Sequence, residues 1–215
     1  MVTIGGLSAP YVLDVVDGMC LIVMLYDAAF EMLCRRLSSF HPFSLGFRAQ
    51  LATMLSLVEL KRGALMVACG QRQAKVWFLC QGHAKEVSCS EQDGKEHVSW
   101  FWFAGDFLFS YPGFFAQEPA IADMRLIEDC TLLEISFDDF VQLRESFPEV
   151  PILVEKIRSY YERLRVGHAS DLVNLSARER YQRFYGQHRS LFQVAKQKDI
   201  TSFLGIRNDG FHRYQ

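Results

Sequence analysis

The sequence lacks any C-x-x-C pair. Its six cysteines, Cys20, Cys34, Cys69, Cys80, Cys89 and Cys130, are scattered along the first two thirds of the chain. This spacing does not match zinc or iron–sulfur ligands, and it is typical of reduced, partly buried thiols in a cytosolic protein. We therefore expect no metal and no cofactor, and a cytoplasmic location.

Long hydrophobic runs are also lacking. The start has no basic n-region of a signal peptide. The apolar segment 19–25 is too short to span a bilayer, and it lies between Asp17 and Asp27. We interpret it as part of an N-terminal helix with a buried stripe, and we expect no membrane partner.

The near-neutral charge of the chain conceals two unlike parts. Residues 1–155 carry 11 Lys and Arg against 20 Asp and Glu, a net charge of −9. Residues 156–215 carry 12 against 5, a net charge of +7. A basic block behind an acidic body suggests a module that faces a polyanion, although a solvated helical surface gives the same pattern.

The middle of the chain has the texture of a β-rich domain. Half of the 215 residues are hydrophobic, so the protein is globular, with one large domain or two modest ones. Residues 29–58 show helical spacing interrupted at His41-Pro42. From about 58 to 135, short strand-like runs follow one another, and Asp93-Gly94 predicts a tight hairpin between two of them. These features favour an antiparallel β-barrel or roll.

A long helix should follow the roll from about residue 146 to 170. Either Pro148 or Pro151 can stand in its first turn, where the missing N–H has no cost. Its apolar positions recur at alternating spacings of three and four, namely Val150, Leu153, Ile157, Tyr160 and Leu164. Two readings remain open for this seam, packing on its own domain or pairing with the same helix of a second subunit, and we favour the dimer.

Two further helical signals stand near the end. The segment Ser176–Glu179 reads as a capping box, in which the serine hydroxyl and the glutamate each satisfy a free backbone amide. Counting from Gln197 then yields the spacing of a helix-turn-helix motif, with Gly205 at the turn. The apolar contacts between its two helices would be made by Ile200, Leu204, Ile206, Phe211 and Tyr214.

The order of these motifs resembles the catabolite-activator/FNR (Crp/Fnr) superfamily of bacterial transcription regulators, in particular its divergent Bacteroidetes-type branch. The resemblance rests on segments 93–97, 126–136, 176–180 and 197–206 in that sequence. It implies an α+β fold with an antiparallel, jelly-roll-like β-roll. The domains would be an N-terminal extension at 1–28, a cyclic-nucleotide-binding-like sensor domain at 29–145, a dimerisation helix at 146–170, and a helix-turn-helix DNA-binding domain at 171–215.

The resemblance also implies partners and a DNA-binding surface. A homodimer would bind a palindromic operator through two successive major grooves about 34 Å apart, and RNA polymerase would be a further contact. Arg213 corresponds to an arginine that the family places on the recognition helix, where it could read guanine. The DNA-binding candidates are Lys196, Gln197, Lys198, Arg207, Asn208, Asp209, His212 and Arg213.

The ligand motif of the family is altered here. Members that bind cyclic nucleotides carry a Gly-Glu pair for the ribose and an Arg-Ser pair for the phosphate, because a buried phosphate needs a charge-assisted partner. Gly105-Asp106 resembles the first pair, but Ala120-Ile121 stands in place of the second. Glu118 and Asp123 flank it with negative charge, and Arg125 comes a few residues too late. The sequence therefore disfavours a response to cAMP.

A different small-molecule effector remains open. The stretch after Gly105 is rich in aromatic residues, which fill a core or line an apolar ligand pocket. The effector-pocket candidates are Gly105, Asp106, Phe107, Phe109, Phe114, Ala120 and Ile121, and the dimer-interface candidates are Leu153, Ile157, Tyr160 and Leu164.

Other functions have weaker support in the sequence. Haem ligation through His41, His83 or His97 rests on lone histidines. A cysteine hydrolase would need a thiolate next to an imidazole, for instance Cys80 or Cys89 with His83 or His97, and no spacing demands it. We therefore expect no enzyme.

The main alternative is a β-roll effector-binding or protein-interaction module with a degenerate helix-turn-helix. Thr201 stands where a small alanine usually lets the two helices approach. Gly210 inside the recognition helix costs about 1 kcal/mol relative to alanine.

Overall fold

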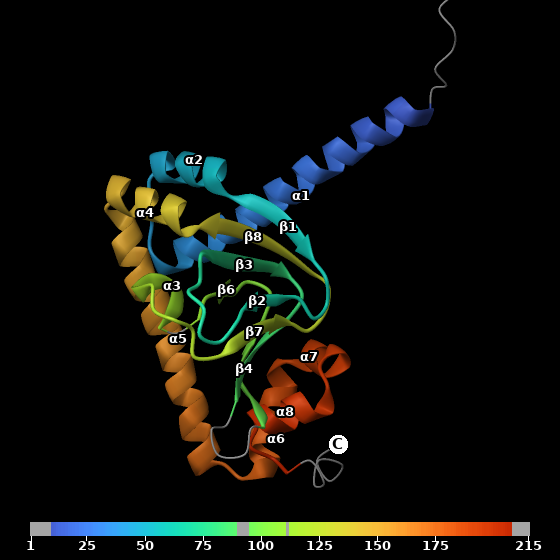
Figure 1. The fold of residues 1–215 in the computed structure, drawn as a ribbon, viewed down its shortest axis with the longest axis vertical. Helices are drawn as coiled ribbons and strands as arrows, with labels where there is room; N and C mark the ends of the chain where they lie inside the picture. The colour runs from blue at the N-terminus through green and yellow to red at the C-terminus, as the bar shows by residue number, and fades with distance from the viewer. Residues whose placement is uncertain (1–9, 90–94, 111, 208–215) are drawn as a thin grey trace, which may run out of the picture.

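The computed structural model describes residues 10–89, 95–110 and 112–207, with the side chains from residue 24 onward. A β-roll forms the centre of the molecule (Figure 1). The long helix α5 runs along one side of the roll, and the last three helices lie together at its lower end.

The β-roll consists of two four-stranded antiparallel sheets. The first has the order β1-β8-β3-β6 and the second β2-β7-β4-β5. The strands are β1 (Ser56–Leu60), β2 (Leu65–Val67), β3 (Lys75–Gln81), β4 (Ala84–Cys89), β5 (Glu96–Trp102), β6 (Phe107–Leu108), β7 (Asp123–Leu126) and β8 (Cys130–Ser136). The predicted fold class is confirmed.

In the described part of the sequence, two helices precede the strands of the roll, the short α3 lies between β6 and β7, and the others follow β8. The helices are α1 (Pro10–Phe40), α2 (Leu45–Met54), the single turn α3 (Gly113–Ala116), α4 (Phe137–Ser146), α5 (Glu149–Asn174), α6 (Ala177–Gln187), α7 (Arg189–Val194) and α8 (Gln197–Phe203). Serine hydroxyls cap three of them: Ser44 caps α2, Ser136 caps α4, and Ser176 caps α6. The capping box predicted at Ser176 and Glu179 is confirmed in full.

The predicted hairpin pairs two neighbouring strands of the second sheet. β4 and β5 are antiparallel, with Ala84 opposite Trp102 and Ser88 opposite His97. The Asp93-Gly94 turn itself lies outside the described residues. β5 is the edge strand of its sheet, so one row of its backbone groups must find partners elsewhere.

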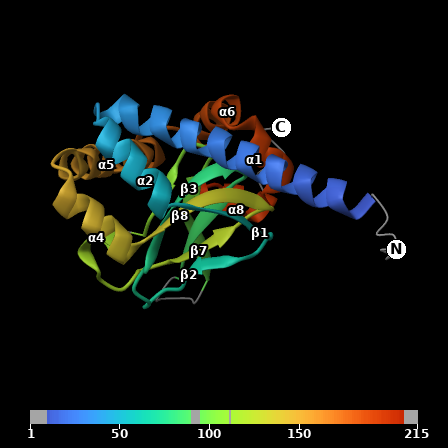
Figure 2. The same cartoon turned by 90° about the horizontal axis from the view of Figure 1, so that it is seen from above.

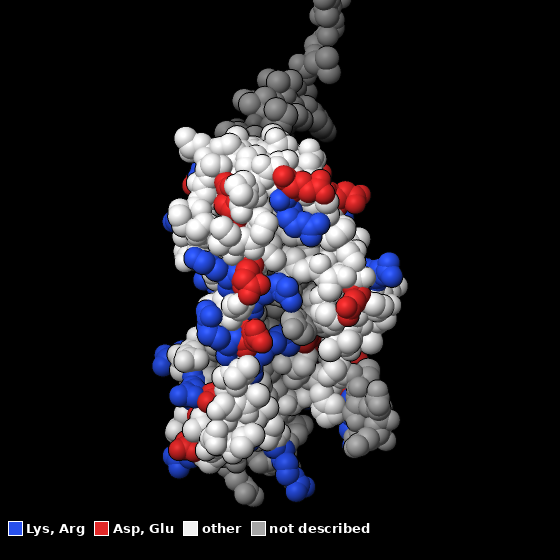
Figure 3. Space-filling view, turned by 90° about the vertical axis from the view of Figure 1, so that its left-hand side faces the viewer, with Lys and Arg blue, Asp and Glu red and all other residues white. Residues whose placement is uncertain are grey.

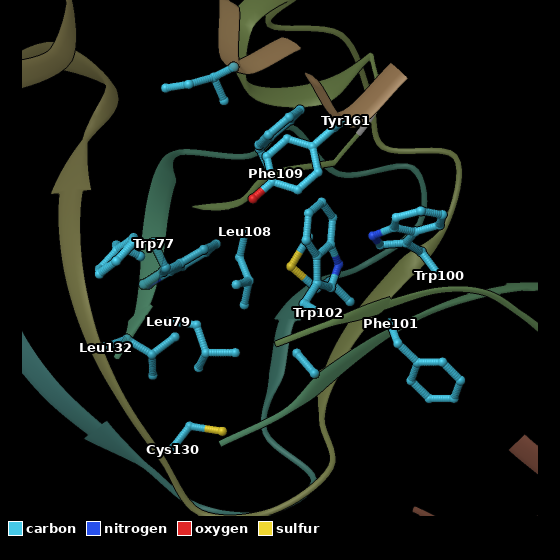
Figure 4. Packing of buried hydrophobic residues seen from close by; sticks show 14 of the residues in the cluster. Trp77, Leu79, Trp100, Phe101, Trp102, Leu108, Phe109, Cys130, Leu132 and Tyr161 are labelled. Carbon is cyan, nitrogen blue, oxygen red and sulfur yellow. The ribbon is translucent and has the colours of Figure 1, made fainter. Parts of the chain in front are cut away.

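The core of the roll is dominated by large side chains with no exposed surface. Trp102, Leu108, Leu79 and Leu132 are each 0% exposed. Figure 4 shows Trp102 between Leu108 and Tyr161, with Phe109 above it. Strand residues alternate between faces, so Phe101 points away from Trp102 and leaves the roll toward the C-terminal helices.

The N-terminal helix differs from the prediction. The expected boundary between residues 28 and 29 lies inside α1, which runs without interruption from Pro10 to Phe40 and ends before His41-Pro42. Phe30, Leu33 and Leu37 bury one face of its second half. Figure 2 shows α1 lying across the molecule next to α2, and the Tyr26 hydroxyl donates to the carbonyl of Ala52 at 2.6 Å.

The end of the roll also has more helix than expected. The sequence placed one helix at 146–170, whereas the structure has α4 within the segment assigned to the roll and α5 from Glu149 to Asn174. Ser136 starts α4 by accepting the amide of Asp139 at 3.1 Å. Pro148 stands at the N-cap of α5, where a missing N–H has no cost.

A tight approach of two loops fixes Gly82 between β3 and β4. Its φ angle is +103°, and a Cβ at this position would lie 2.5 Å from Sγ of Cys130 and 3.1 Å from the carbonyl oxygen of Asp129. Both the backbone conformation and the space therefore require glycine.

We expect Gly82→Ala to lower the free energy of unfolding by about 3 kcal/mol, because left-handed strain and overpacking add. Gly63→Ala is the matched control, since Gly63 also has a positive φ of +83° but open space around it. That control should cost about 1 kcal/mol. Urea unfolding measures both, and equal losses would show that the contact with Cys130 contributes nothing.

Candidate functional site

The short helix α8 and the turn after it lie where the sequence predicts the first half of a helix-turn-helix. Ile200, Leu204 and Ile206 are buried, as the motif requires. Gly205 has a φ of +60°, the left-handed conformation expected at the turn. The remaining apolar positions of the motif, Phe211 and Tyr214, lie outside the described residues.

Arg180 of α6 holds this turn in place. Its Nε donates to the carbonyl of Leu204 at 2.7 Å, and its Nη2 donates to that of Gly205 at 3.1 Å. Its Nη1 donates to the carbonyl of Leu175, at the end of α5, at 2.6 Å. One guanidinium therefore satisfies free carbonyls at the ends of two helices.

The opposite side of α8 lies on the edge strand β5 of its own roll. Lys85 of β4 and Asp199 of α8 form an ion pair of 2.8 Å, with only 16% and 9% of the two side chains exposed. The amide of Val98 donates to the hydroxyl of Ser202 at 3.1 Å. An ion pair with so little exposure is costly to break, because either partner alone would be left as a buried charge.

A cluster of rings completes this contact. The ring of Phe203 lies 5.1 Å from Phe101 and 6.1 Å from Trp100 between centroids. The imidazole of His168, from α5, stacks on Phe203 at 3.9 Å with an interplanar angle of 2°. In the same way His188, at the end of α6, stacks on Phe103 of the roll at 4.0 Å.

The DNA-binding candidates are only partly covered by the structure. Lys196, Lys198 and Arg207 are exposed, and Gln197 is half-buried, so these four surround α8 and its turn. Asn208, Asp209, His212 and Arg213 lie outside the described residues. The predicted recognition helix therefore stays a prediction.

The dimer-interface candidates do not share one surface. Leu153 and Ile157 are buried against the core of their own chain, at 3% and 6% exposure. Tyr160 is half-buried, with Arg36 placed over its ring, and Leu164 is partly exposed. The first half of the seam read from the sequence therefore packs on its own chain, where α5 contacts α1 and α4, and this was the alternative reading.

The effector-pocket candidates are also divided. Gly105 and Asp106 border a large cleft, whereas Phe107 borders a small apolar pocket between the roll and α5. Phe109, Phe114 and Ala120 are buried in the core, and Ile121 is 68% exposed. The described residues therefore do not gather these seven around a single cavity.

Asp106 has a structural partner. Its carboxylate accepts from the hydroxyl of Tyr161 at 2.9 Å and from the amide of Phe103 at 2.8 Å. The Tyr161 hydroxyl in turn accepts from the amide of Phe107 at 2.8 Å. Burial raises the pKa of Asp106 and, more strongly, that of Tyr161. This acid therefore ties α5 to the loop before β6.

A cleft of about 1050 Å³ lies where the roll, α5 and the C-terminal helices meet. We call it the central cleft, and it is bordered by Phe103 and His83 of the roll, Arg163 and His168 of α5, and Phe184 and His188 of α6. Sequence reasoning missed it, because its residues come from segments more than a hundred positions apart.

The histidines of the central cleft differ in their partners. His83 pairs through Nδ1 with Glu128, and its Nε2 lies 3.3 Å from the hydroxyl of Ser190. Burial lowers the pKa of His168 and of His188, and the neighbouring His83 contributes to the lowering at His188. Both stacked imidazoles therefore favour the neutral form.

Two of the cysteines, Cys80 and Cys130, are poorly suited to act as nucleophiles. Burial raises the pKa of Cys80 to about 11 and that of Cys130 to about 11. A thiol with so high a pKa stays protonated near neutral pH, whereas a nucleophile must be a thiolate. No group of three or more potential metal ligands gathers in the described part of the chain.

The strands of the roll lie in a segment that matches the model of a known protein family. Residues 57–147 match the model of the cyclic nucleotide-binding domain. This segment spans β1 to the end of α4, so the roll is similar to a domain of that type. A comparison of the sequence with curated proteins finds no match. Across the described residues, no helix has the length and apolar character needed to cross a membrane.

Solved structures share the fold over most of the chain. FixK2 from Bradyrhizobium japonicum is similar with a TM-score of 0.64 at 14% identity, covering 74% of this chain and 82% of that one. The c-di-GMP responsive global regulator CLP of Xanthomonas campestris has a TM-score of 0.58 at 16% identity, over 80% and 89%. The catabolite activator protein of Thermus thermophilus has 0.51 at 16%, over 83% and 84%.

The two stacked histidines generate a pH prediction. Because the pKa of each histidine is lower in the folded protein, the unfolded chain binds these two protons more tightly. The stability of the fold is therefore at its full value above the ordinary histidine pKa of 6.5, and it decreases as the pH falls toward the lower pKa of the folded state. We expect the melting temperature to fall between about pH 7.5 and about pH 5.5, and to fall less in the double variant His168→Phe with His188→Phe, which keeps the stacking. His41→Phe, at the end of α1, is the control and should behave like the wild type. An identical pH dependence in all three proteins would contradict the assignment.

Proposed function

We propose that this protein is a DNA-binding transcription regulator of the Crp/Fnr type, which acts as a homodimer on a palindromic operator and does not respond to cAMP. One observation carries the proposal: a roll of the cyclic nucleotide-binding type is followed by the long helix α5 and by helices that end in α8 and a left-handed Gly205. A regulator of gene expression, CLP, shares the fold over 80% of this chain.

The surface chemistry of the C-terminal part supports DNA as the partner. Residues 156–215 carry a net charge of +7. Lys196 and Lys198 are exposed on either side of the first residue of α8, and Arg207 is exposed beyond the turn. Exposed cations around a helix start are suited to phosphate contacts, which position a protein on duplex DNA.

The interior of the roll argues against a cyclic nucleotide. At the position of the phosphate-binding pair, Ala120 is buried and Ile121 is exposed, so neither supplies a cation. Arg125 is neutralised by Asp123 at 2.6 Å and by Glu96 at 3.3 Å. Phe114, which belongs to the single turn α3, is fully buried and fills part of the interior. A buried phosphate would therefore lack the charged partner that it needs.

A dimer would form through the outer face of α5. Ile152, Val166 and Val173 are exposed on this helix, and they follow one another at multiples of seven residues. This is the spacing of one seam position in a parallel coiled coil. The proposal therefore moves the interface away from Leu153 and Ile157, which are already buried within their own chain.

A second candidate function is favoured by the packing of α8. The pair of Lys85 and Asp199 and the contact of Ser202 with β5 hold α8 against its own roll. A module that has lost DNA binding and acts through protein contacts would retain the same contacts. The two candidates differ in whether Arg213 reads a base.

DNA binding can be tested with duplex fragments that the protein itself selects from a pool of random-sequence DNA. We expect a palindromic sequence to be enriched, and its affinity to fall steeply as salt rises. Arg213→Ala should weaken binding to the selected sequence roughly tenfold or more, by loss of a base contact of about 1–3 kcal/mol. Fluorescence anisotropy measures both. Arg178→Ala, an exposed arginine at the start of α6, is the control, and equal affinity of the two variants would favour the second candidate.

The dimer prediction concerns the outer face of α5. Val166→Asp places a charge in the proposed seam. We expect this variant to be a monomer at micromolar concentration, because association would bury a charge that has no partner. Val166 is 63% exposed in the single chain, so its replacement should leave the fold intact. Analytical ultracentrifugation gives the mass. Gln142→Asp, exposed on α4, should remain dimeric, and a dimeric Val166→Asp protein would place the interface elsewhere.

A further inference from the structure

The central cleft has the size of a ligand site and lies outside the roll interior. Its volume of about 1050 Å³ is at the upper end of the range of small-molecule pockets, about 300–1,000 Å³. It is bordered by the roll, including the turn between β3 and β4 and the loop before β6, by Arg36 of α1, by the middle of α5, and by the C-terminal helices. An occupant would therefore touch both the sensor roll and the proposed DNA-binding part.

The acids of the central cleft already have partners. Asp171 pairs with Arg183 at 2.5 Å, and Glu128 pairs with His83. Asp106 is held by the hydroxyl of Tyr161 at 2.9 Å. None of these three carboxylates is therefore available to a cationic ligand without breaking an existing contact.

Several cations of the central cleft have no such partner. Within the described residues, no ion pair joins Arg36, Arg163 or Arg180 to a carboxylate, and Arg180 donates to four backbone carbonyls. Arg36 has a buried Nε without an acceptor there. Figure 3 shows Lys and Arg side chains gathered around the middle of the face that carries α5. A concave site with surplus positive charge attracts anions.

The rest of the lining is aromatic. Phe103 and Phe184 both border the central cleft, and each is within ring-contact distance of His188, at 4.0 and 4.8 Å between centroids. Trp100 borders it too, and its indole N–H is a buried donor without an acceptor in the described structure. Aromatic rings in the wall favour a ligand that carries a ring of its own.

We propose that the central cleft binds a small organic anion that carries an aromatic ring. The ring packs against the aromatic wall of Phe103 and Phe184, and the anionic group is held by Arg163 and Arg36. This site is separate from the roll interior, so it goes beyond the proposed function and holds whether or not the chain binds DNA. Because the ligand contacts the roll and α6 at the same time, its binding stabilises by mass action the arrangement in which the C-terminal helices pack on the roll.

Two fluorescent probes with the same rings test the proposal on the full chain. One is 8-anilinonaphthalene-1-sulfonate, an aromatic anion, and the other is N-phenyl-1-naphthylamine, which lacks the sulfonate. We expect the anion to bind at least roughly tenfold more tightly than the neutral probe, by one charge-assisted contact, and this preference should shrink as salt rises.

Variants then locate the binding. Arg163→Gln should weaken the anionic probe roughly tenfold and leave the neutral probe unchanged. Arg158→Gln is the matched control, since Arg158 is an exposed arginine five residues earlier on α5 that does not border the cleft. Asp171→Asn releases Arg183 and should tighten the anionic probe several-fold while leaving the neutral probe unchanged, whereas misfolding exposes apolar surface and would increase the binding of both probes.

Three outcomes would overturn the proposal. Equal affinity of the two probes would show an apolar patch without anion recognition. Equal effects of Arg163→Gln and Arg158→Gln would place the anion elsewhere on the surface. Absence of any anion-dependent binding, together with no gain in Asp171→Asn, would show that the surplus charge of the central cleft serves no ligand. DNA binding is measured separately with the selected fragments, so its failure is distinguishable from each of these.

Discussion

The position of the C-terminal helices depends on the contact between α8 and the edge strand β5. An edge strand needs a cover for its free backbone groups, and here the amide of Val98 finds the hydroxyl of Ser202. The pair of Lys85 and Asp199 beside it fixes the register, because sliding α8 along the strand would leave two poorly exposed charges apart. The ring of Phe203 then sits in the cluster formed by Phe101 and His168.

The helix α5 links this contact to the interior of the roll. Near its middle, the Tyr161 hydroxyl donates to Asp106 and accepts from the amide of Phe107. One turn later, Arg165 binds Glu86 of β4 through two hydrogen bonds of 3.0 and 2.9 Å. The acid that resembles the ribose-binding residue of the family therefore holds a helix instead. A displacement of the loop before β6 would therefore move α5 through its contacts with Tyr161. The stacking of His168 on Phe203 would pass that movement to α8.

The parts predicted well from sequence are those whose interactions lie within a few residues. The box of Ser176 and Glu179, the pairing of β4 with β5 and the left-handed turn at Gly205 each depend on neighbours in the chain. The central cleft was not predictable in this way, since contacts such as that between His83 and Ser190 span more than a hundred residues. The seam of α5 was read correctly as apolar, but periodicity does not say which surface covers an apolar face, and Leu153 and Ile157 are buried within their own chain, where α5 contacts α1 and α4.

The packing of α8 on its own roll bears on whether the motif can still meet DNA. The residues used for docking are Asp199, Ser202 and Phe203. The cations expected at phosphates, Lys196 and Lys198, remain exposed outside that contact. Docking therefore uses other side chains than the two exposed lysines, and a phosphate contact by these lysines would not compete with it. The contact of α8 with β5 orients the motif relative to α5, so the spacing between two copies of it in a dimer would be set by α5 and the roll together.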